Sequence, residues 1–359
     1  MPVCSLNELD TPALVVDLDL LEGNIRKMAD FFAEREAKLR PHVKTHKCPE
    51  IALMQLRAGA KGITCAKLGE AEAMAARGVD DILVANQIVG RKKIERLLEL
   101  LGKCNLAIAV DDPSNAQTIS DMALSAGKSV DVLIEVDVGM GRCGAKPGKE
   151  ALQLAKKIAQ MKGINLRGLM GYEGHAVYIE NYGERRSECL KALNALLGTK
   201  SLLEEDGFEV GVVSGGGTGT YDITGSYPGV TEVQAGSYAT MDARYKKVVQ
   251  EFDCALRVLT TVISCPAPGR AVVDAGMKSI TTEFGLPVVK GVEGATVSRL
   301  SEEHGILKLE EGAKLCLEDK IELIPSHGCT TVNLHEKIFA VRGGVVESVW
   351  DVAARGKSA

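Results

Sequence analysis

Short apolar runs recur along the first two thirds of the chain, and most of them are separated by stretches with helical spacing. Eight runs are predicted to form strands, at residues 39–44, 62–67, 81–86, 106–111, 132–137, 166–172, 210–215 and 230–237. Six helices are predicted between them, at residues 49–59, 69–77, 91–101, 112–126, 149–161 and 182–206, whereas residues 218–229 have the composition of a loop. This alternation predicts an α/β fold, a closed parallel (β/α)8 TIM barrel, with an open doubly wound sheet as the structural alternative.

The sequence pattern changes near residue 246. Strand-like segments separated by Gly and Pro then follow without comparable helical stretches, at residues 256–265, 270–274, 288–292 and 339–342. They predict a second, mostly antiparallel β domain, with which the early segment 11–19 can pair. The predicted domains are therefore residues 20–246 for the barrel, and residues 1–19 with 247–359 for the β domain.

The charge and composition of the chain narrow the classes of partner. The 359 residues carry a net charge of −5 and contain no long basic block, so neither nucleic acid nor an anionic membrane is expected as a partner. No apolar run reaches the roughly 18 residues that span a bilayer, and the amino terminus lacks the features of a secretory signal. We expect a cytoplasmic protein that acts on a small molecule, with most of its ten scattered cysteines as free thiols.

Polar side chains gather at the predicted carboxyl ends of the barrel strands, where TIM barrels place their catalytic groups. Among them are Lys44, Arg142, Tyr172 and His175. The Gly-rich turn 214–220 follows the seventh strand and offers backbone N–H groups and hydroxyls, in the usual phosphate-binding position of this fold. This end of the predicted barrel is therefore the candidate site for a phosphorylated ligand.

Lys44 ends the first predicted strand in a run that also contains His42, His46 and Lys47. Neighbouring positive charge and burial would lower the pKa of its amine, which favours the neutral nucleophile needed for Schiff-base formation. An isolated lysine in such a run more often belongs to a solvated basic loop. The predicted phosphate-binding turn favours the chemical role.

Four segments in this order resemble the alanine-racemase-type (fold type III) pyridoxal-phosphate enzymes, and among them the D-threonine aldolase / D-serine dehydratase family. These are residues 40–47, 137–144, 214–220 and 231–238, within a resemblance that runs over nearly the whole chain. The resemblance implies that Lys44 forms a Schiff base with pyridoxal 5'-phosphate and that Arg142 faces the phenolic oxygen of this cofactor. It also implies a homodimer.

The same resemblance implies which further residues surround the cofactor ring and phosphate. These cofactor-binding candidates are Tyr172, Ser214, Gly216, Gly217, Thr218, Gln234, Gly236, Ser237 and Tyr238.

A second candidate site lies in the predicted β domain, at His327 and Cys329. The two residues lie two positions apart on segment 325–334, which is predicted to be extended. Their side chains should therefore point the same way and can ligate one divalent ion. An incidental histidine on a packed strand is the alternative. In the resembled family this position is a metal site that simple racemases lack. A thiolate favours zinc or another borderline-soft ion over magnesium. We expect zinc or manganese at this site.

The resemblance implies a metal-assisted lyase that acts on D-3-hydroxy amino acids. We expect D-threonine aldolase-type cleavage to glycine and an aldehyde, with His175 as a candidate base for the hydroxyl proton. A histidine bonded to the loop backbone is an equal alternative at that position. The family's aldolases more often carry aspartate where Cys329 stands and its dehydratases cysteine, although segment 330–335 is more similar to aldolases.

Three other functions remain open from the sequence. A D-serine or D-3-hydroxyaspartate dehydratase would give a 2-oxo acid and ammonia, with Lys44 removing the α-proton. An amino-acid racemase would need no metal but a second base opposite Lys44. A non-catalytic pyridoxal-phosphate carrier would typically be a bare barrel, so the metal-bearing β domain counts against it.

Overall fold

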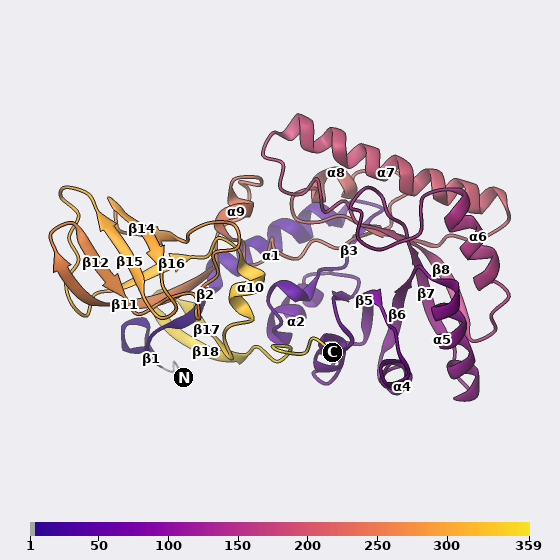
Figure 1. Cartoon of the computed structure of the whole chain (residues 1–359), viewed down its shortest axis with the longest axis horizontal. Coiled ribbons are helices and arrows are strands. Elements are labelled where there is room, and N and C mark those ends of the chain that lie inside the picture. The colour runs from indigo at the N-terminus through magenta and orange to yellow at the C-terminus, as the bar shows by residue number, and fades with distance from the viewer. Residues whose placement is uncertain (1–3) are drawn as a thin grey trace. The chain divides into compact units, whose positions relative to one another are not determined.

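The computed structural model describes residues 4–359, which divide into two compact units (Figure 1). The barrel unit comprises Met28–Lys44, Ile51–Gly236 and Lys357–Ala359. The β unit comprises the described residues up to Lys27, together with Thr45–Glu50 and Ser237–Gly356. The predicted domain boundaries at residues 19 and 246 stay a prediction.

Eight parallel strands form the sheet of the barrel unit. In chain order they are β3 (Lys38–Leu39), β4 (Ile63–Cys65), β5 (Asp81–Gln87), β6 (Asn105–Val110), β7 (Val130–Glu135), β8 (Ile164–Gly171), β9 (Val212–Gly215) and β10 (Glu232–Val233). They are ordered β3-β10-β9-β8-β7-β6-β5-β4, and a parallel bridge between His42 and Thr64 joins the two ends of this order. The prediction of an eight-stranded parallel barrel is confirmed.

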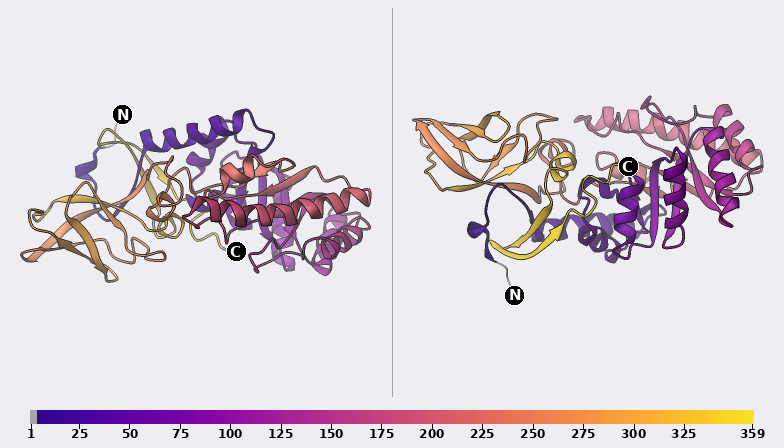
Figure 2. Two further views of the ribbon diagram at one scale, coloured as in Figure 1. Left: turned by 90° about the horizontal axis from the view of Figure 1, so that it is seen from above. Right: turned by 60° about the horizontal axis from the view of Figure 1, so that its bottom comes forward.

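Helices connect most of these strands, as predicted. They are α2 (Pro49–Arg57), α3 (Leu68–Ala75), α4 (Arg91–Leu100), α5 (Pro113–Ser125), α6 (Lys149–Ile158) and α7 (Tyr182–Glu205), preceded by α1 (Leu18–Ala33). In Figure 1, α5, α6 and α7 lie outside the strands, and the views in Figure 2 show the same layering. Local sequence explains the start of α5, because the Asp112 side chain accepts from the amides of Ser114 and Asn115.

Two local predictions for the barrel unit are wrong. Residues 221–225, predicted as loop, form the short helix α8 (Tyr221–Gly225), whose Tyr221 ring packs on Phe31 at 4.9 Å between centroids. Tertiary packing stabilises this turn, since its β-branched and glycine residues have weak helical propensity. The first predicted strand also ends early, because Val43–Thr45 form the 3-10 helix η2. Lys44 therefore lies on a turn, where its amide donates to Nδ1 of His42.

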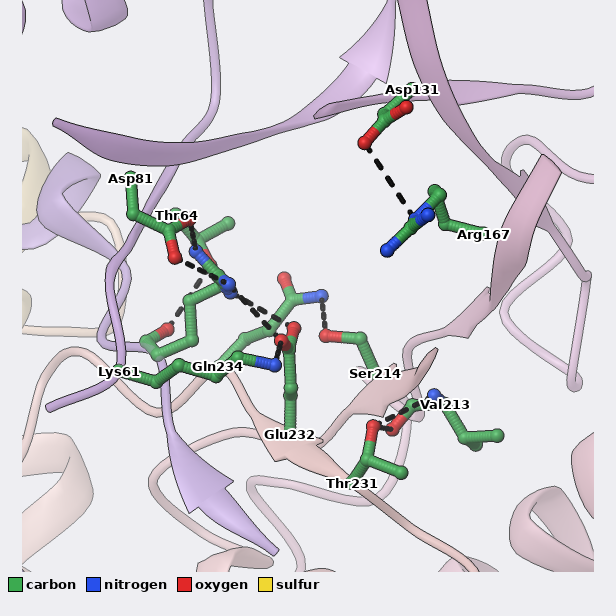
Figure 3. Close-up of polar contacts among 11 residues, drawn as sticks. Lys61, Thr64, Asp81, Asp131, Arg167, Val213, Ser214, Thr231, Glu232 and Gln234 are labelled. Atoms are coloured by element: carbon green, nitrogen blue, oxygen red, sulfur yellow. Dashed lines mark hydrogen bonds and ion pairs between the residues drawn. The ribbon is translucent and has the colours of Figure 1, made fainter. Parts of the chain in front are cut away.

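A buried ion network joins three strands at the amino end of the barrel (Figure 3). Arg40 contacts Oε2 of Glu232 at 2.9 Å through Nε and Oδ1 of Asp81 at 2.7 Å through Nη1, and Lys61 contacts Glu232 at 2.8 Å. Burial disfavours the charged forms of Arg40 and Glu232, but the ion-pair partners of these two groups outweigh this effect. The pKa of Arg40 is therefore raised and the pKa of Glu232 is lowered.

Replacing Glu232 with alanine is expected to lower the free energy of unfolding at pH 7 by about 3 kcal/mol, because buried Arg40 loses its main partner. The folded-state pKa of Glu232 lies below the unfolded value. Its contribution is therefore complete at neutral pH and is lost as the pH falls through the folded-state pKa. Urea unfolding at pH 7 and at lower pH measures this difference. Glu209→Ala, at an exposed glutamate of the same unit, is the matched control; equal losses for both variants would contradict the account.

The β unit contains a ten-stranded sheet whose neighbouring strands are antiparallel, except that β2 and β17 are parallel. Its strands are β1 (Cys4–Ser5), β2 (Ala13–Asp17), β11 (Leu256–Ala267), β12 (Arg270–Val273), β13 (Val288–Lys290), β14 (Ala295–Leu300), β15 (Gly305–Leu309), β16 (Lys320–Ile324), β17 (Lys337–Arg342) and β18 (Val345–Asp351). The predicted, mostly antiparallel β domain is confirmed, as is the pairing of the early segment, since β2 pairs with β11. The unit also contains the 3-10 helix η1 (Leu6–Glu8) and the short helices α9 (Ala243–Lys246) and α10 (Gly328–Val332).

The ten cysteines all lie within residues 4–359 and are free thiols, as predicted. Over the same described residues, none of the helices combines the length and apolarity that crossing a bilayer requires.

Candidate active site

Lys44, Arg142 and Tyr172 come together in the barrel unit. They follow β3, β7 and β8, at the carboxyl end of the barrel. Lys44 Nζ lies 5.7 Å from the centroid of the Tyr172 ring, and Arg142 Cζ lies 5.9 Å from it. Two cations over one aromatic ring form a positively charged site suited to an anionic ligand.

The Gly-rich turn packs against the same tyrosine. A Cβ atom added to Gly217 would lie 3.2 Å from Cε2 of Tyr172 and 3.1 Å from Cγ1 of Val177. Gly216 has a φ of +77°, a conformation that side-chain-bearing residues rarely adopt. We call this turn, residues 214–220, the cradle; at Gly216 and Gly217 a side chain would be strained or crowded.

Buried Glu173 holds this turn from within the barrel unit. Its carboxylate accepts from the amide of Gly216 at 3.1 Å and from the hydroxyls of Thr220 at 2.8 Å and Thr224 at 2.6 Å. The amide of Gly217 donates to Oγ1 of Thr220 at 3.2 Å. The amides of Gly216 and Gly217 therefore donate to groups of the protein itself. What these two glycines contribute to the cradle is the absence of a side chain. Sequence reasoning missed Glu173, whose only signal is its position directly after Tyr172.

Replacing Glu173 with alanine is expected to lower the free energy of unfolding by about 3 kcal/mol, because several buried donors lose their acceptor. Glu173→Gln keeps one acceptor oxygen and should lose less. Pyridoxal phosphate should also bind at least several-fold more weakly to the alanine variant. Urea unfolding and cofactor titration measure the two effects. Unchanged cofactor affinity in the alanine variant would show that Glu173 does not shape the cradle.

The remaining cofactor-binding candidates divide between the two units. In the barrel unit, Gln234 Nε2 donates to Oγ of Ser214 at 2.9 Å (Figure 3), and both side chains are buried, as is Thr218. Gly236 ends the barrel unit. Ser237 and Tyr238 belong to the β unit, where the buried Tyr238 ring packs on Phe252 at 5.6 Å between centroids. The roles of all these residues stay predictions.

Two carboxylates support the segment that carries Arg142. Asp137 accepts from the amides of Gly139 and Gly141, and the Gly141 bond is the largest cause of its lowered pKa. Glu135 lies 3.8 Å from Arg142 and accepts from Nε2 of Gln87. The pKa of Glu135 is raised because burial outweighs the effects of Gln87 and Arg142.

His175 is exposed and lies over the same segment, with Cε1 3.1 Å from a Cβ added to Gly139. Its ring is also close enough to lower the pKa of Asp137 and that of Glu188. Exposure suits proton exchange with solvent or substrate, and the choice between a base and a structural histidine stays open.

His327 and Cys329 are brought together in the β unit, although not on a strand. The predicted extended segment is wrong here, because His327 caps α10 and Cys329 lies in its first turn. The buried Asp242 accepts the amide of Gly328 at 3.0 Å, and Thr331 Oγ1 donates to the carbonyl of His327 at 2.9 Å. These bonds stabilise a helical turn that the local β-branched sequence does not predict.

His327 contacts two side chains that carry potential metal-ligand atoms. Nδ1 of His327 lies 2.7 Å from Oε2 of Glu283, and the ring also hydrogen-bonds the Cys329 side chain. Burial lowers the pKa of His327, but Cys329, Glu283 and Asp242 together raise it to about 9. An imidazole and a thiol with carboxylates behind them fit a borderline-soft divalent cation.

Known protein families match both parts of the chain. The family "Alanine racemase, N-terminal domain" matches residues 16–244, and "Putative serine dehydratase domain" matches residues 255–341. A D-threonine aldolase from Arthrobacter sp is 40% identical over 98% of this chain and 94% of its own length.

Two solved structures show the same architecture. The D-threonine aldolase from Filomicrobium marinum has a TM-score of 0.96 and 38% identity, covering 99% of this chain and 98% of the other. A cysteine-to-alanine variant of D-threo-3-hydroxyaspartate dehydratase, in its metal-free form, has a TM-score of 0.83 and 29% identity, covering 97% and 98%. The chain therefore belongs to the D-threonine aldolase / D-serine dehydratase family of enzymes with the alanine-racemase-type fold.

Proposed function

We propose that this protein is a metal-assisted, pyridoxal-phosphate-dependent lyase that cleaves D-3-hydroxy amino acids to glycine and an aldehyde. The observation that carries the proposal is the His327–Cys329 pair, in a chain that also gathers Lys44, Arg142 and Tyr172. A racemase would not need the His327–Cys329 pair. Identity of 40% to a D-threonine aldolase favours the aldolase reaction over dehydration.

The barrel-unit residues fit pyridoxal phosphate. Lys44 would anchor its aldehyde carbon, Arg142 would face its phenolic oxygen, and Tyr172 would pack beside its ring. The cradle at Gly216 and Gly217 would admit its phosphate, with Ser214, Thr218, Gln234 and Gly236 as further contacts from the same unit. Ser237 and Tyr238, which belong to the β unit, stay predicted contacts. When bound, the cofactor supplies an electron sink for the negative charge that develops on the α-carbon.

His327 and Cys329 would hold a zinc or manganese ion, which supplies Lewis acidity toward the 3-hydroxyl of the substrate. His175 would accept the proton of this hydroxyl as the Cα–Cβ bond breaks. Arg142 would keep positive charge beside the cofactor throughout. We further propose that the protein acts as a homodimer in the cytoplasm.

Dehydration is the second candidate, and one observation favours it. Cys329 stands where the family's aldolases more often carry aspartate. In that reaction Lys44 would remove the α-proton and the 3-hydroxyl would leave; hydrolysis of the resulting enamine by water would then give a 2-oxo acid and ammonia.

Product analysis separates these reactions. Purified protein with pyridoxal phosphate and Mn²⁺ or Zn²⁺ is incubated with D-threonine and, in parallel, with D-serine. Acetaldehyde and glycine from D-threonine are the expected products. Formation of 2-oxobutanoate or pyruvate with ammonia would replace the aldolase by the dehydratase. Interconversion of D- and L-threonine after removal of metal would contradict both lyase reactions.

A further inference from the structure

A loop between β12 and β13 packs against the turn that carries His327 and Cys329. Glu283 Oε2 lies 2.7 Å from Nδ1 of His327, and the Phe284 ring lies 4.9 Å from the imidazole, centroid to centroid. The amide of Thr281 donates to Oγ1 of Thr331 at 3.2 Å. The imidazole is thus held by an acceptor and an aromatic ring from one loop of the same unit.

The Glu283 contact determines which ring nitrogen remains for a metal ion. A carboxylate at Nδ1 keeps the proton there, so Nε2 is the nitrogen with a lone pair for a cation. Oε2 of Glu283 also accepts from Oγ1 of Thr330 at 3.1 Å. This carboxylate therefore contacts His327 and also Thr330, the residue that follows Cys329.

The backbone of the turn is held by a different carboxylate. Asp242 is buried, and it accepts from the amide of Gly328 at 3.0 Å and from the amide of Tyr245 at 2.8 Å. Loss of Glu283, whose side chain is 44% exposed, should therefore release the imidazole ring while the helical turn stays in place.

We propose that Glu283 is a positioning residue that orients His327 for a divalent ion and so raises metal affinity at the His327–Cys329 pair. This inference rests on the proposed metal-dependent function. In this role Glu283 contacts neither the substrate nor the ion.

The test measures Co²⁺ binding to the full-length, cofactor-loaded protein by competition with a chelator, and records the visible Co²⁺ spectrum. Glu283→Ala is expected to weaken binding by about 10–100-fold, as loss of the carboxylate behind a metal-bound histidine typically does. Glu283→Gln retains an acceptor for Nδ1 without charge and should fall between wild type and Glu283→Ala. Thr330→Val should give a smaller loss. Glu303→Ala, at an exposed glutamate of the same unit, should bind as wild type does.

The spectrum and further variants distinguish a failed inference from a failed function. A changed Co²⁺ absorption with an unchanged cofactor band in Glu283→Ala supports a positioning role. Wild-type affinity and spectrum in both Glu283 variants, with binding lost in His327→Ala, would overturn the inference and leave the proposed metal site standing. Wild-type Co²⁺ binding in both His327→Ala and Cys329→Ala would overturn the metal site itself, and the role of Glu283 with it.

Discussion

Replacing Lys44 with alanine is expected to abolish the visible absorption band of lysine-bound pyridoxal phosphate and to lower turnover of D-threonine by roughly 10³-fold or more. The amine is the only group of the Lys44, Arg142 and Tyr172 cluster that can bond covalently to the cofactor aldehyde. Its Nζ also lies over the Tyr172 ring, beside which the cofactor ring would pack. Absorbance spectra of the cofactor-loaded variants and steady-state rates measure both effects.

Lys67→Ala is the matched control for this prediction, because Lys67 is an exposed lysine that follows barrel strand β4. It should retain the visible band and the rate. If Lys44→Ala kept the band while Lys67→Ala lost it, the anchor would be assigned to the wrong strand end.

Removing divalent ions, or replacing His327 or Cys329 with alanine, is expected to reduce cleavage of D-threonine by at least about 100-fold while leaving the visible cofactor band unchanged. The residues proposed to hold the metal are separate from those proposed to anchor the cofactor, and the proposed role of the metal is Lewis acidity toward the 3-hydroxyl. Adding back Mn²⁺ or Zn²⁺ should restore the chelated wild-type enzyme but neither variant.

Exposed residues of the same unit serve as controls for the metal variants. His304→Ala and Cys316→Ala remove the same side-chain types and should retain activity. Full cleavage activity in a chelated enzyme with no residual metal would contradict the role assigned to His327 and Cys329.

The regular parts of the fold could be predicted because their signal is local. Apolar runs alternating with helical stretches identify the barrel, and the loss of that alternation identifies the β unit. The errors lie where tertiary contacts override local preference. The helical turn after His327 depends on Asp242, which is 86 residues away from Gly328 in the sequence.

The supporting carboxylates could not be predicted for a related reason. Glu173 and Glu283 look like ordinary surface glutamates in the sequence, and their partners Gly216 and His327 lie 43 and 44 residues away. The Arg40–Glu232 pair spans 192 residues. Such contacts become visible only when strand order and register are known. The roles of Lys44, His327 and Cys329, in contrast, are predictions that rest on their neighbours in sequence, which resemble those of a family.

The bond that breaks at the α-carbon tests the central claim most directly. D-threonine carrying deuterium at the α-carbon is incubated with the cofactor- and metal-loaded enzyme in ordinary water, and the products are analysed by mass spectrometry. Cleavage of Cα–Cβ predicts acetaldehyde and glycine that retains one deuterium, because the α-hydrogen is never removed and the new proton comes from solvent. Release of the deuterium to water with formation of 2-oxobutanoate, or with unlabelled threonine, would contradict an aldolase.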